Sequence, residues 1–423
     1  MPAACRQWRR LIVHFLIIAV LAGVNVAQAQ EVEFGACVHL ALNRSDAASV
    51  TAALQKGGFA SFRDDVFWSA IEQKPAELNF PPNFEQLDRA VTAMHASGGR
   101  PLLILDYGNP FYDHGGLVVS PQATEAFERY VRFVVRHFGR RVEQYEVWNE
   151  WSGGFGSVPK VPAGDAAAYA RLLERTYRTI KAENPHATVV GGAVAGTDGA
   201  WSDAFFKAGG LRYLDAFSVH SYTLFHLHSN PEVAIKFLDY IHQSMQAAEP
   251  SRSIPVLVTE MGWPTSRGGH GVSETQAGSN LVRFLALAMA RPWVRGVWWY
   301  DLIDDGDSDA DAEQRFGLLH TQLAPKPAFL LAQAMAPLLA HRADVHSYRV
   351  EGGGYAVTGR NRDEHWLIAW KLEPELRNWS EGIAEATDEG HAYDWTGAAL
   401  PEDGSPRFWK QVNDQWLPVS MPQ

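Results

Sequence analysis

Two glutamates end apolar, strand-like runs in this chain of 423 residues. Glu150 closes the run 142–150, within the hexapeptide EVWNEW, and Glu260 closes the run 254–262, within VTEMGW. A single carboxylate at a strand end is most simply a solvated terminus. A glutamate between two indoles, matched by a second glutamate at the end of another strand, instead indicates a pocket that withdraws the carboxylates from water.

Two carboxyl groups that face each other across a pocket can cleave a glycosidic bond. One must be protonated to donate to the leaving oxygen, and the other must be ionised to attack or stabilise the anomeric carbon. A hydrophobic wall and a neighbouring negative charge each raise the pKa of a carboxyl group, so together they can separate the two protonation states. This chemistry needs rigid elements that hold the pair at a fixed separation.

From Glu31 onward, eight strand-like runs alternate with amphipathic helical runs. The predicted strands are 34–40, 59–67, 100–108, 142–150, 187–194, 214–222, 254–262 and 294–302. The clearest predicted helices are 84–99, 124–139, 165–183, 273–290 and 327–339. Strands that alternate with crossover helices form a parallel sheet, and eight such units close a barrel. We therefore predict an α/β protein with a (β/α)8 TIM barrel over residues 30–340; a doubly wound open sheet is the alternative.

The spacing of the two glutamates agrees with this count of strands. They are 110 residues apart, which is three βα units of roughly 37 residues each. Eight such units need about 300 residues, close to the span from Glu31 to Leu339. In a βα barrel the strands end at one face, where the chemistry takes place. The barrel therefore brings Glu150 and Glu260 to the same mouth.

The two ends of the chain differ from the barrel region in composition and in the pattern of apolar residues. Residues 1–29 are predicted to be a cleavable signal peptide, because three arginines precede the apolar run 11–26 and a small-x-small site ends at Ala29. This predicts a periplasmic or secreted protein; an uncleaved N-terminal anchor is the alternative. Residues 341–423 alternate apolar and polar side chains between turn clusters, which predicts a small C-terminal β-rich domain of β-sandwich-like type.

Composition excludes several classes of function. The net charge is −11, and about −14 without residues 1–29, so we expect no nucleic-acid partner. Cys37 is the only cysteine after residue 29, so no intramolecular disulfide can form there. The 15 tryptophans suit either stacking surfaces or a large core. No phosphate-loop pattern and no Gly-x-Ser-x-Gly elbow occurs, so nucleotide and acyl chemistry lack support.

The Asn-Glu pair ending the fourth predicted strand and the Glu ending the seventh resemble the signature of clan A retaining glycoside hydrolases. Within that clan the chain is most similar to family 39 and to related endoglycosidases that act on bacterial exopolysaccharides. The segment 297–319, after the eighth predicted strand, is similar to a stretch common in that group. The resemblance covers roughly residues 31–340; a family 5-like member would have much the same features.

The resemblance implies a role for each matching position. Glu150 resembles the acid/base and Glu260 the nucleophile, while Asn149 resembles the residue that binds the sugar 2-hydroxyl. His220 and Tyr222, at the end of the sixth predicted strand, match positions that orient the two carboxyl groups.

Further positions match residues that contact the nucleophile or the sugar. Arg63 matches an arginine that keeps the nucleophile ionised, as a nearby cation should. Trp299 resembles the aromatic floor under the cleaved sugar, and His39 is a predicted subsite donor. Trp151 and Trp263 are either sugar platforms or packing residues.

Metal and cofactor sites are not expected. The acidic run Asp304–Asp311 lacks the closing glutamate of a calcium loop, so a solvated loop is the preferred interpretation. His226 and His228 form an H-x-H pair near His220, and a metal site there is the minor alternative. We predict neither a metal nor a cofactor.

We therefore expect a retaining glycoside hydrolase that cuts a polysaccharide or oligosaccharide, with internal cleavage of a bacterial exopolysaccharide as the context implied by the resemblance. An exo-acting β-glycosidase of xylosidase type is one alternative, and a transglycosylase is another. A non-catalytic carbohydrate-binding protein, associated with exopolysaccharide assembly or export machinery, is the alternative from a different class.

Overall fold

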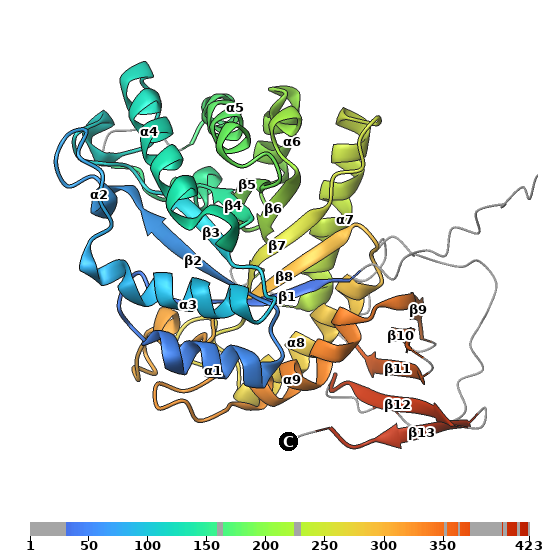
Figure 1. Cartoon of the computed structure of the whole chain (residues 1–423). Coiled ribbons are helices and arrows are strands. Elements are labelled where there is room, and N and C mark those ends of the chain that lie inside the picture. Colours follow the sequence, from blue (N-terminus) through green and yellow to red (C-terminus); the bar gives the residue numbers. More distant parts are fainter. Residues whose placement is uncertain are drawn as a thin grey trace, which may run out of the picture.

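The computed structural model describes residues 31–158, 164–223, 230–350, 353–362, 364–372, 400, 404–412 and 415–421. Its larger part is a closed barrel of eight parallel strands, paired in the order β1 to β8, with helices around the outside (Figure 1). The barrel strands are β1 (Glu33–Cys37), β2 (Ser61–Phe67), β3 (Leu102–Asp106), β4 (Gln144–Val147), β5 (Thr188–Ala195), β6 (Ala216–His220), β7 (Val256–Met261) and β8 (Val294–Trp299). The helices are α1 (Ala47–Gly57), α2 (Trp68–Ile71), α3 (Glu85–Ala96), α4 (Pro121–Phe138), α5 (Ala166–Glu183), α6 (Gly199–Lys207), α7 (Pro231–Ala248), α8 (Glu274–Met289) and α9 (Pro327–Ala340).

The remaining strands form a five-stranded antiparallel sheet. They are β9 (Ala343–Arg349), β10 (Gly354–Asn361), β11 (Glu364–Lys371), β12 (Arg407–Val412) and β13 (Gln415–Val419), in the order β13-β12-β11-β10-β9. The (β/α)8 barrel and the C-terminal β-rich part are thus confirmed. The described strands of this part form one sheet, and one face of that sheet packs on barrel helices.

Helix α4 illustrates how the sequence determines these elements. The side chain of Ser120 accepts a hydrogen bond from the Ala123 amide, and Pro121 follows in the first turn, so both residues favour a helix start. Apolar residues at three- and four-residue steps form the buried face of the helix. They are Phe127, Tyr130, Val131, Val134 and Val135, the stripe that defines the predicted helix 124–139.

The barrel interior is filled by side chains of its strands, which include Cys37, Leu102, Val190, Ala216, Leu257 and Trp298. Trp298 on β8 is fully buried there, and its indole Nε1 donates to Ser61 Oγ at 2.9 Å. Gly35 on β1 leaves the space for this indole, because a Cβ at that position would lie 2.3 Å from Trp298 Cδ1. The barrel is therefore packed below its mouth, as is usual for this fold.

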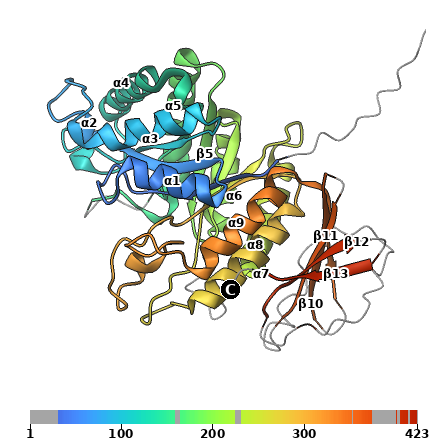
Figure 2. The same ribbon diagram turned by 60° about the horizontal axis from the view of Figure 1, so that its bottom comes forward.

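The C-terminal sheet lies against α7, α8 and α9 (Figure 2). Arg283 of α8 is fully buried and forms a two-pronged ion pair with Glu232 of α7, at 2.9 and 2.7 Å. The indole of Trp370 on β11 donates to the same carboxylate at 2.9 Å. One buried carboxylate thus connects two barrel helices with the sheet.

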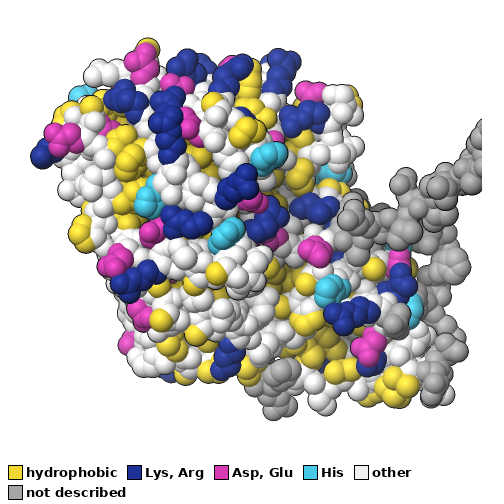
Figure 3. Space-filling view, in the orientation of Figure 1, with side chains coloured by type: hydrophobic (Ala, Val, Ile, Leu, Met, Phe, Trp, Pro, Cys, Tyr) yellow, Lys and Arg dark blue, Asp and Glu magenta, His cyan; other side chains and the backbone are white. Residues whose placement is uncertain are grey.

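Arginines gather on the outer face of α4 and α5, although the chain as a whole is acidic (Figure 3). Four of these six arginines are in ion pairs. Arg132 and Arg136 pair with Glu183 and Arg175 pairs with Glu128 between the two helices, whereas Arg178 pairs with Glu174 within α5. Exposed pairs of this kind contribute little to stability. Because the pairs largely neutralise these arginines, this face is a weak attractor for polyanions.

None of the helices within the described ranges is both long and apolar enough to span a bilayer. The predicted signal peptide and the His226–His228 pair lie outside the described residues.

We predict that Arg283→Ala lowers the free energy of unfolding by about 3–5 kcal/mol, because it leaves the buried carboxylate of Glu232 without its cation. Urea denaturation followed by circular dichroism measures the change. Arg178→Ala, which removes an exposed ion pair with Glu174, is the control and should have a far smaller effect. Equal effects of the two substitutions would contradict the structural role of the buried pair.

Candidate active site

Side chains from the ends of the barrel strands line a cavity of about 590 Å³. Its walls include polar residues, which are His39, Arg63, Asp64, Asp65, Asn149, Glu150, Tyr222, Glu260 and Glu313. They also include apolar and aromatic residues, which are Cys37, Val38, Leu42, Phe67, Ile104, Tyr107, Phe155, Ala195, Tyr300 and Phe316. Polar groups that converge in a half-open, partly aromatic cavity are typical of a ligand site.

A sharp turn after β4 brings Glu150 to this cavity. Trp148 and Glu150 both have positive φ angles, 70° and 49°, which are uncommon for residues other than glycine. The indole of Trp148 donates to the Phe155 carbonyl at 3.0 Å, and that of Trp151 donates to the Asp165 carbonyl at 3.2 Å. The two indoles also contact each other edge to face, with ring centroids 5.0 Å apart. The tryptophans on either side of Glu150 therefore hold the turn that presents its carboxylate.

The guanidinium of Arg63 connects three strands beneath the cavity. Its Nε donates to Glu146 Oε2 at 2.7 Å, its Nη1 to Glu260 Oε1 at 2.6 Å, and its Nη2 to Asn149 Oδ1 at 2.8 Å. Asn149 in turn donates from Nδ2 to the Tyr107 hydroxyl at 2.8 Å. Since Arg63 is only 3% exposed, water does not compete with these bonds, and the group fixes the positions of Asn149 and Glu260.

Glu260 is held in its ionised form. Burial raises the pKa of this carboxyl group, but the charges of His220 and Arg63 and the hydroxyl of Tyr222 outweigh burial, so the pKa lies below its ordinary value of 4.5. The Tyr222 hydroxyl donates to Glu260 Oε2 at 3.1 Å. A carboxylate that stays ionised and faces a cavity can act as a nucleophile.

His220 connects the two glutamates through a chain of hydrogen bonds. Its Nδ1 lies 2.8 Å from Glu150 Oε1, and its Nε2 lies 3.1 Å from the hydroxyl oxygen of Thr259. The Thr259 hydroxyl donates its only proton to Glu146 Oε1 at 2.9 Å, so toward His220 it can only accept. When Glu150 is ionised and Nε2 donates to Thr259, both ring nitrogens of His220 carry a proton and the ring is a cation. Arg63 Nη2, which can only donate, also lies 3.4 Å from Nε2, farther than the Thr259 oxygen.

The electrostatics agree with this assignment of protons. Burial lowers the pKa of His220, but the negative charge of Glu260 and the hydrogen bond to Glu150 more than reverse this effect, and the net pKa is raised. The proton shared by Glu150 and His220 is therefore stored next to the cavity, where Glu150 can deliver it.

The two glutamates are close enough to act on one bond. An oxygen of Glu150 and an oxygen of Glu260 lie within 4.8 Å of each other. Retaining glycosidases separate their two carboxyl groups by about 5–5.5 Å, whereas inverting enzymes need about 6.5–9.5 Å to admit a water. The short separation suits direct attack by one glutamate while the other transfers a proton.

Seven of the ten predicted site residues come together here. They are Glu150, Glu260, Asn149, His220, Tyr222, Arg63 and His39. Of these, His220 lies behind Glu150 with no exposed surface, and Arg63 lies in the middle of β2 instead of at its end.

The three predicted tryptophan platforms do not reach the cavity. Trp151 has no exposed surface, and Trp263 and Trp299 are each 1% exposed. Trp263 and Trp299 pack on each other with ring centroids 5.7 Å apart. Successive side chains of a strand point to opposite faces, so when Trp298 points into the barrel, Trp299 must point out toward the helices. The aromatic ring of this region that lines the cavity is that of Tyr300.

Sequence reasoning missed Glu146, Tyr107 and Tyr300. Tyr107 directly follows β3, so the rule that selected the other strand ends would also have found it. Strand alternation places Tyr300 on the same face as Trp298, but the sequence alone does not show which face of this strand points inward. Glu146 lies four residues before Glu150 in the same predicted strand, so strand alternation places both side chains on one face and would have found it.

His39 lies at the side of the cavity, and its Nδ1 is 2.8 Å from Asp305 Oδ1. Burial lowers the pKa of His39, but the hydrogen bond to Asp305 and the charge of Asp301 raise it to about 9. Two groups of side chains in the described part of the chain bring possible metal-ligating atoms together. One is Glu150, His220 and Glu260, whose ion pairs are described above, and the other is His39, Asp301 and Asp305.

No family model matches the sequence, and no curated protein matches it either. Solved structures do match. A family 39 glycoside hydrolase from Bacteroides cellulosilyticus WH2 superposes with a TM-score of 0.67 at 24% identity, over 82% of this chain and 72% of that chain. A monomeric β-xylosidase from Caulobacter crescentus CB15 has a TM-score of 0.59 at 18% identity, over 81% and 74%. A GH5_18 structure from Streptomyces cattleya in complex with GlcNAc has a TM-score of 0.60 at 18% identity, over 74% and 81%.

The chain therefore has the fold of these glycoside hydrolases. The resemblance to family 39 that the motifs indicate is confirmed at the level of the fold. What the fold is used for in this chain depends on the site itself.

We predict that His220 keeps its proton above pH 6.5, its ordinary pKa, and that Glu260→Gln lowers the pKa of His220 by removing a negative charge. NMR titration of the imidazole nitrogens measures both values. Glu77→Gln, which changes an exposed carboxylate in a pair with Lys74, is the control and should leave His220 unchanged. Titration of wild-type His220 below pH 6.5 would show that burial prevails over the glutamates.

Proposed function

We propose that this protein is a retaining glycoside hydrolase that cleaves a polysaccharide. The observation that carries the proposal is the approach of Glu150 and Glu260 to within 4.8 Å, with Arg63 and Tyr222 on one carboxylate and His220 on the other. A protein that only binds carbohydrate would not need a nucleophile kept ionised beside a stored proton. This contrast favours an enzyme over the non-catalytic binding protein.

The proposed reaction has two steps. In the first, Glu260 Oε attacks the anomeric carbon while Glu150 protonates the glycosidic oxygen, so a glycosyl ester forms and the leaving sugar departs as an alcohol. In the second, Glu150 removes a proton from water, which attacks the same carbon and releases Glu260. Transfer to a sugar hydroxyl instead of water would give a transglycosylase by the same steps.

Other residues of the site support these steps. The amide of Asn149, oriented by Arg63 and Tyr107, is placed to contact a sugar hydroxyl next to the attacked carbon. Rings of Tyr107, Tyr300, Phe155 and Phe316 line the cavity and can pack on the apolar faces of sugar rings.

The proposed substrate is a bacterial exopolysaccharide cut internally, in the periplasm or outside the cell. The support is the motif resemblance to family 39, together with the predicted signal peptide. An exo-acting β-glycosidase is the second candidate, and the structural similarity to a β-xylosidase from Caulobacter crescentus favours it. If the protein acts in the periplasm, we also propose that it associates with exopolysaccharide assembly machinery.

The first test is release of reducing ends from purified bacterial exopolysaccharides and plant glycans. We expect Glu260→Gln to lower activity by at least about a thousandfold while retaining binding, because the nucleophile is lost but the cavity is intact. Mass analysis of the products distinguishes the modes of action: a ladder of sizes means internal cutting, and single sugars mean exo action. No release by either protein, with polymer retained by both, would favour the binding protein.

The role of Glu150 has its own test. Glu150→Gln should reduce turnover of substrates with poor leaving groups by about 10²–10⁴-fold, the usual contribution of general acid catalysis. Activated aryl glycosides need little protonation, so their glycosylation step should lose far less. Equal losses on both kinds of substrate would remove Glu150 as the proton donor.

The pH profile tests the role of Tyr222. Since the Tyr222 hydroxyl helps to lower the pKa of Glu260, Tyr222→Phe should raise that pKa. The nucleophile must be ionised, so the acidic limb of kcat/KM should then move to higher pH. Tyr300→Phe, which removes another hydroxyl from the cavity wall, is the control and should not move the limb in this way. An unmoved limb in Tyr222→Phe would show that this bond does not tune the nucleophile.

A further inference from the structure

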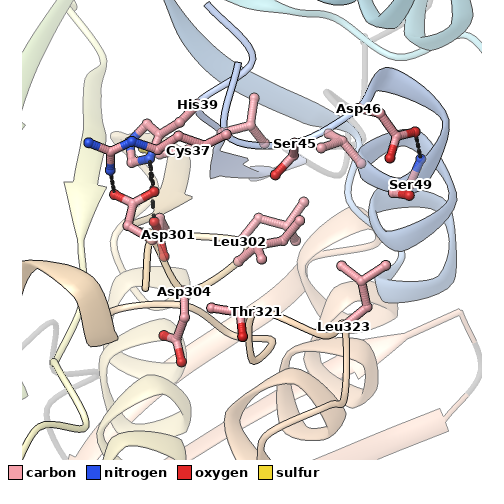
Figure 4. Close-up of a pocket in the computed structure, with 15 residues that line it drawn as sticks. Cys37, His39, Ser45, Asp46, Ser49, Asp301, Leu302, Asp304, Thr321 and Leu323 are labelled. Carbon is pink, nitrogen blue, oxygen red and sulfur yellow. Dashed lines mark hydrogen bonds and ion pairs between the residues drawn. The ribbon is translucent and has the colours of Figure 1, made fainter. Parts of the chain in front are cut away.

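A second polar pocket of about 250 Å³ lies beside the catalytic cavity, between the segment after β1 and the segment after β8 (Figure 4). His39, Asp301 and Asp305 all line this pocket. Figure 4 labels His39 and Asp301 in it. His39 Nδ1 is 2.8 Å from Asp305 Oδ1 and 3.7 Å from Asp301 Oδ2. One possible ligating atom from each of the three residues lies within 4.8 Å of the other two.

One carboxylate oxygen of the buried residue Asp301 lacks a hydrogen-bond partner among the described residues. This residue is 1% exposed, and its Oδ1 has no hydrogen-bond partner among the described residues. Its Oδ2 approaches His39 only at ion-pair distance. A buried carboxylate oxygen without a partner costs free energy, and such a group calls for an explanation such as a bound ion. The arrangement is thus more than a group of acidic residues on a surface.

We propose that His39, Asp301 and Asp305 bind a divalent transition-metal ion. Zinc and its neighbours bind imidazole nitrogen and carboxylate oxygen at about 2.0–2.2 Å, so adjacent ligand atoms lie about 3–3.5 Å apart. The separations of 2.8 and 3.7 Å require only small shifts to match. Calcium and magnesium prefer sites made of oxygen alone, so the imidazole favours a transition metal.

The surroundings can complete such a site. The pocket has room for coordinating waters, each of which occupies about 30 Å³. Arg44 forms an ion pair with Asp305 Oδ2, which leaves Oδ1 for the ion and fixes the carboxylate from behind. Arg44 thus has the position of an outer partner that orients a ligand.

The ion would join two walls of the catalytic cavity. His39 lines both pockets, and it belongs to the segment after β1, whereas both aspartates follow β8. A metal would therefore cross-link these segments next to the predicted nucleophile. Asp305 is part of the acidic run Asp304–Asp311, so one residue of that run would be a ligand although the run is not a calcium loop.

Isothermal titration of the purified protein with zinc chloride tests the proposal. We expect one ion per chain in the wild type, and at least about a hundredfold weaker binding in Asp301→Asn, because even outer partners of ligands are worth about 10–100-fold. Asp309→Asn, which removes an acid of the same run outside the cluster, is the matched control and should bind as the wild type does. Cobalt(II) absorption then reports whether a nitrogen ligand is present, and His39→Gln should change that spectrum.

Three results would overturn the proposal. They are no binding by the wild type, binding that Asp301→Asn leaves unchanged, and binding that Glu260→Gln abolishes, since the last would place the ion at Glu150, His220 and Glu260. If Asp301→Asn does not fold, Asp305→Asn and the cobalt spectrum of the wild type decide in its place. Without zinc binding, a proton on His39 between the two aspartates and the guanidinium of Arg44 on Asp305 would be the counter-charges of the cluster.

Discussion

The rest of the site depends on one buried cation inside the barrel. Arg63 donates to Glu146 and Glu260 and is almost fully removed from water. Removing such charges from water costs several kcal/mol for each ion, and only close pairing with good geometry offsets that cost. The position of Glu260 is therefore coupled to β2 and β4 as well as to its own strand β7. A change to any of these three residues leaves the other two unbalanced.

This coupling also explains why protonation can differ at two glutamates whose carboxylate oxygens lie within 4.8 Å of each other. Glu260 receives hydrogen bonds from Arg63 and Tyr222, whereas Glu150 contacts the imidazole of His220. The asymmetry lies in the hydrogen-bond donors and not in the carboxyl groups themselves. Thr259 adds to this asymmetry: its single hydroxyl proton goes to Glu146, so its oxygen can only accept from the imidazole of His220.

The fold and the two glutamates could be predicted because both follow from periodicity. Strand–helix alternation defines the barrel, and the strand ends define its mouth. Two features resisted prediction. Whether the side chain of Trp299 points into the barrel or out toward the helices depends on the register of β8, and a shift by one residue reverses it. Tyr300, and not Trp299 as predicted, therefore lines the cavity. The partner of Arg63 depends on a contact between β2 and β4. Periodicity within one strand can place Glu146 on the face of Glu150, but it cannot give a contact between two strands.

The burial of five tryptophans in the barrel has a spectroscopic consequence. Trp148, Trp151, Trp263, Trp298 and Trp299 are each at most 1% exposed, and no tryptophan is among the described residues that line the catalytic cavity. Emission from these indoles therefore reports the packing of the barrel and should be blue-shifted, and a sugar entering the cavity would quench it little. The chromophores in position to sense a ligand are tyrosines 107, 222 and 300, so near-ultraviolet difference spectra should follow occupancy better than tryptophan fluorescence does.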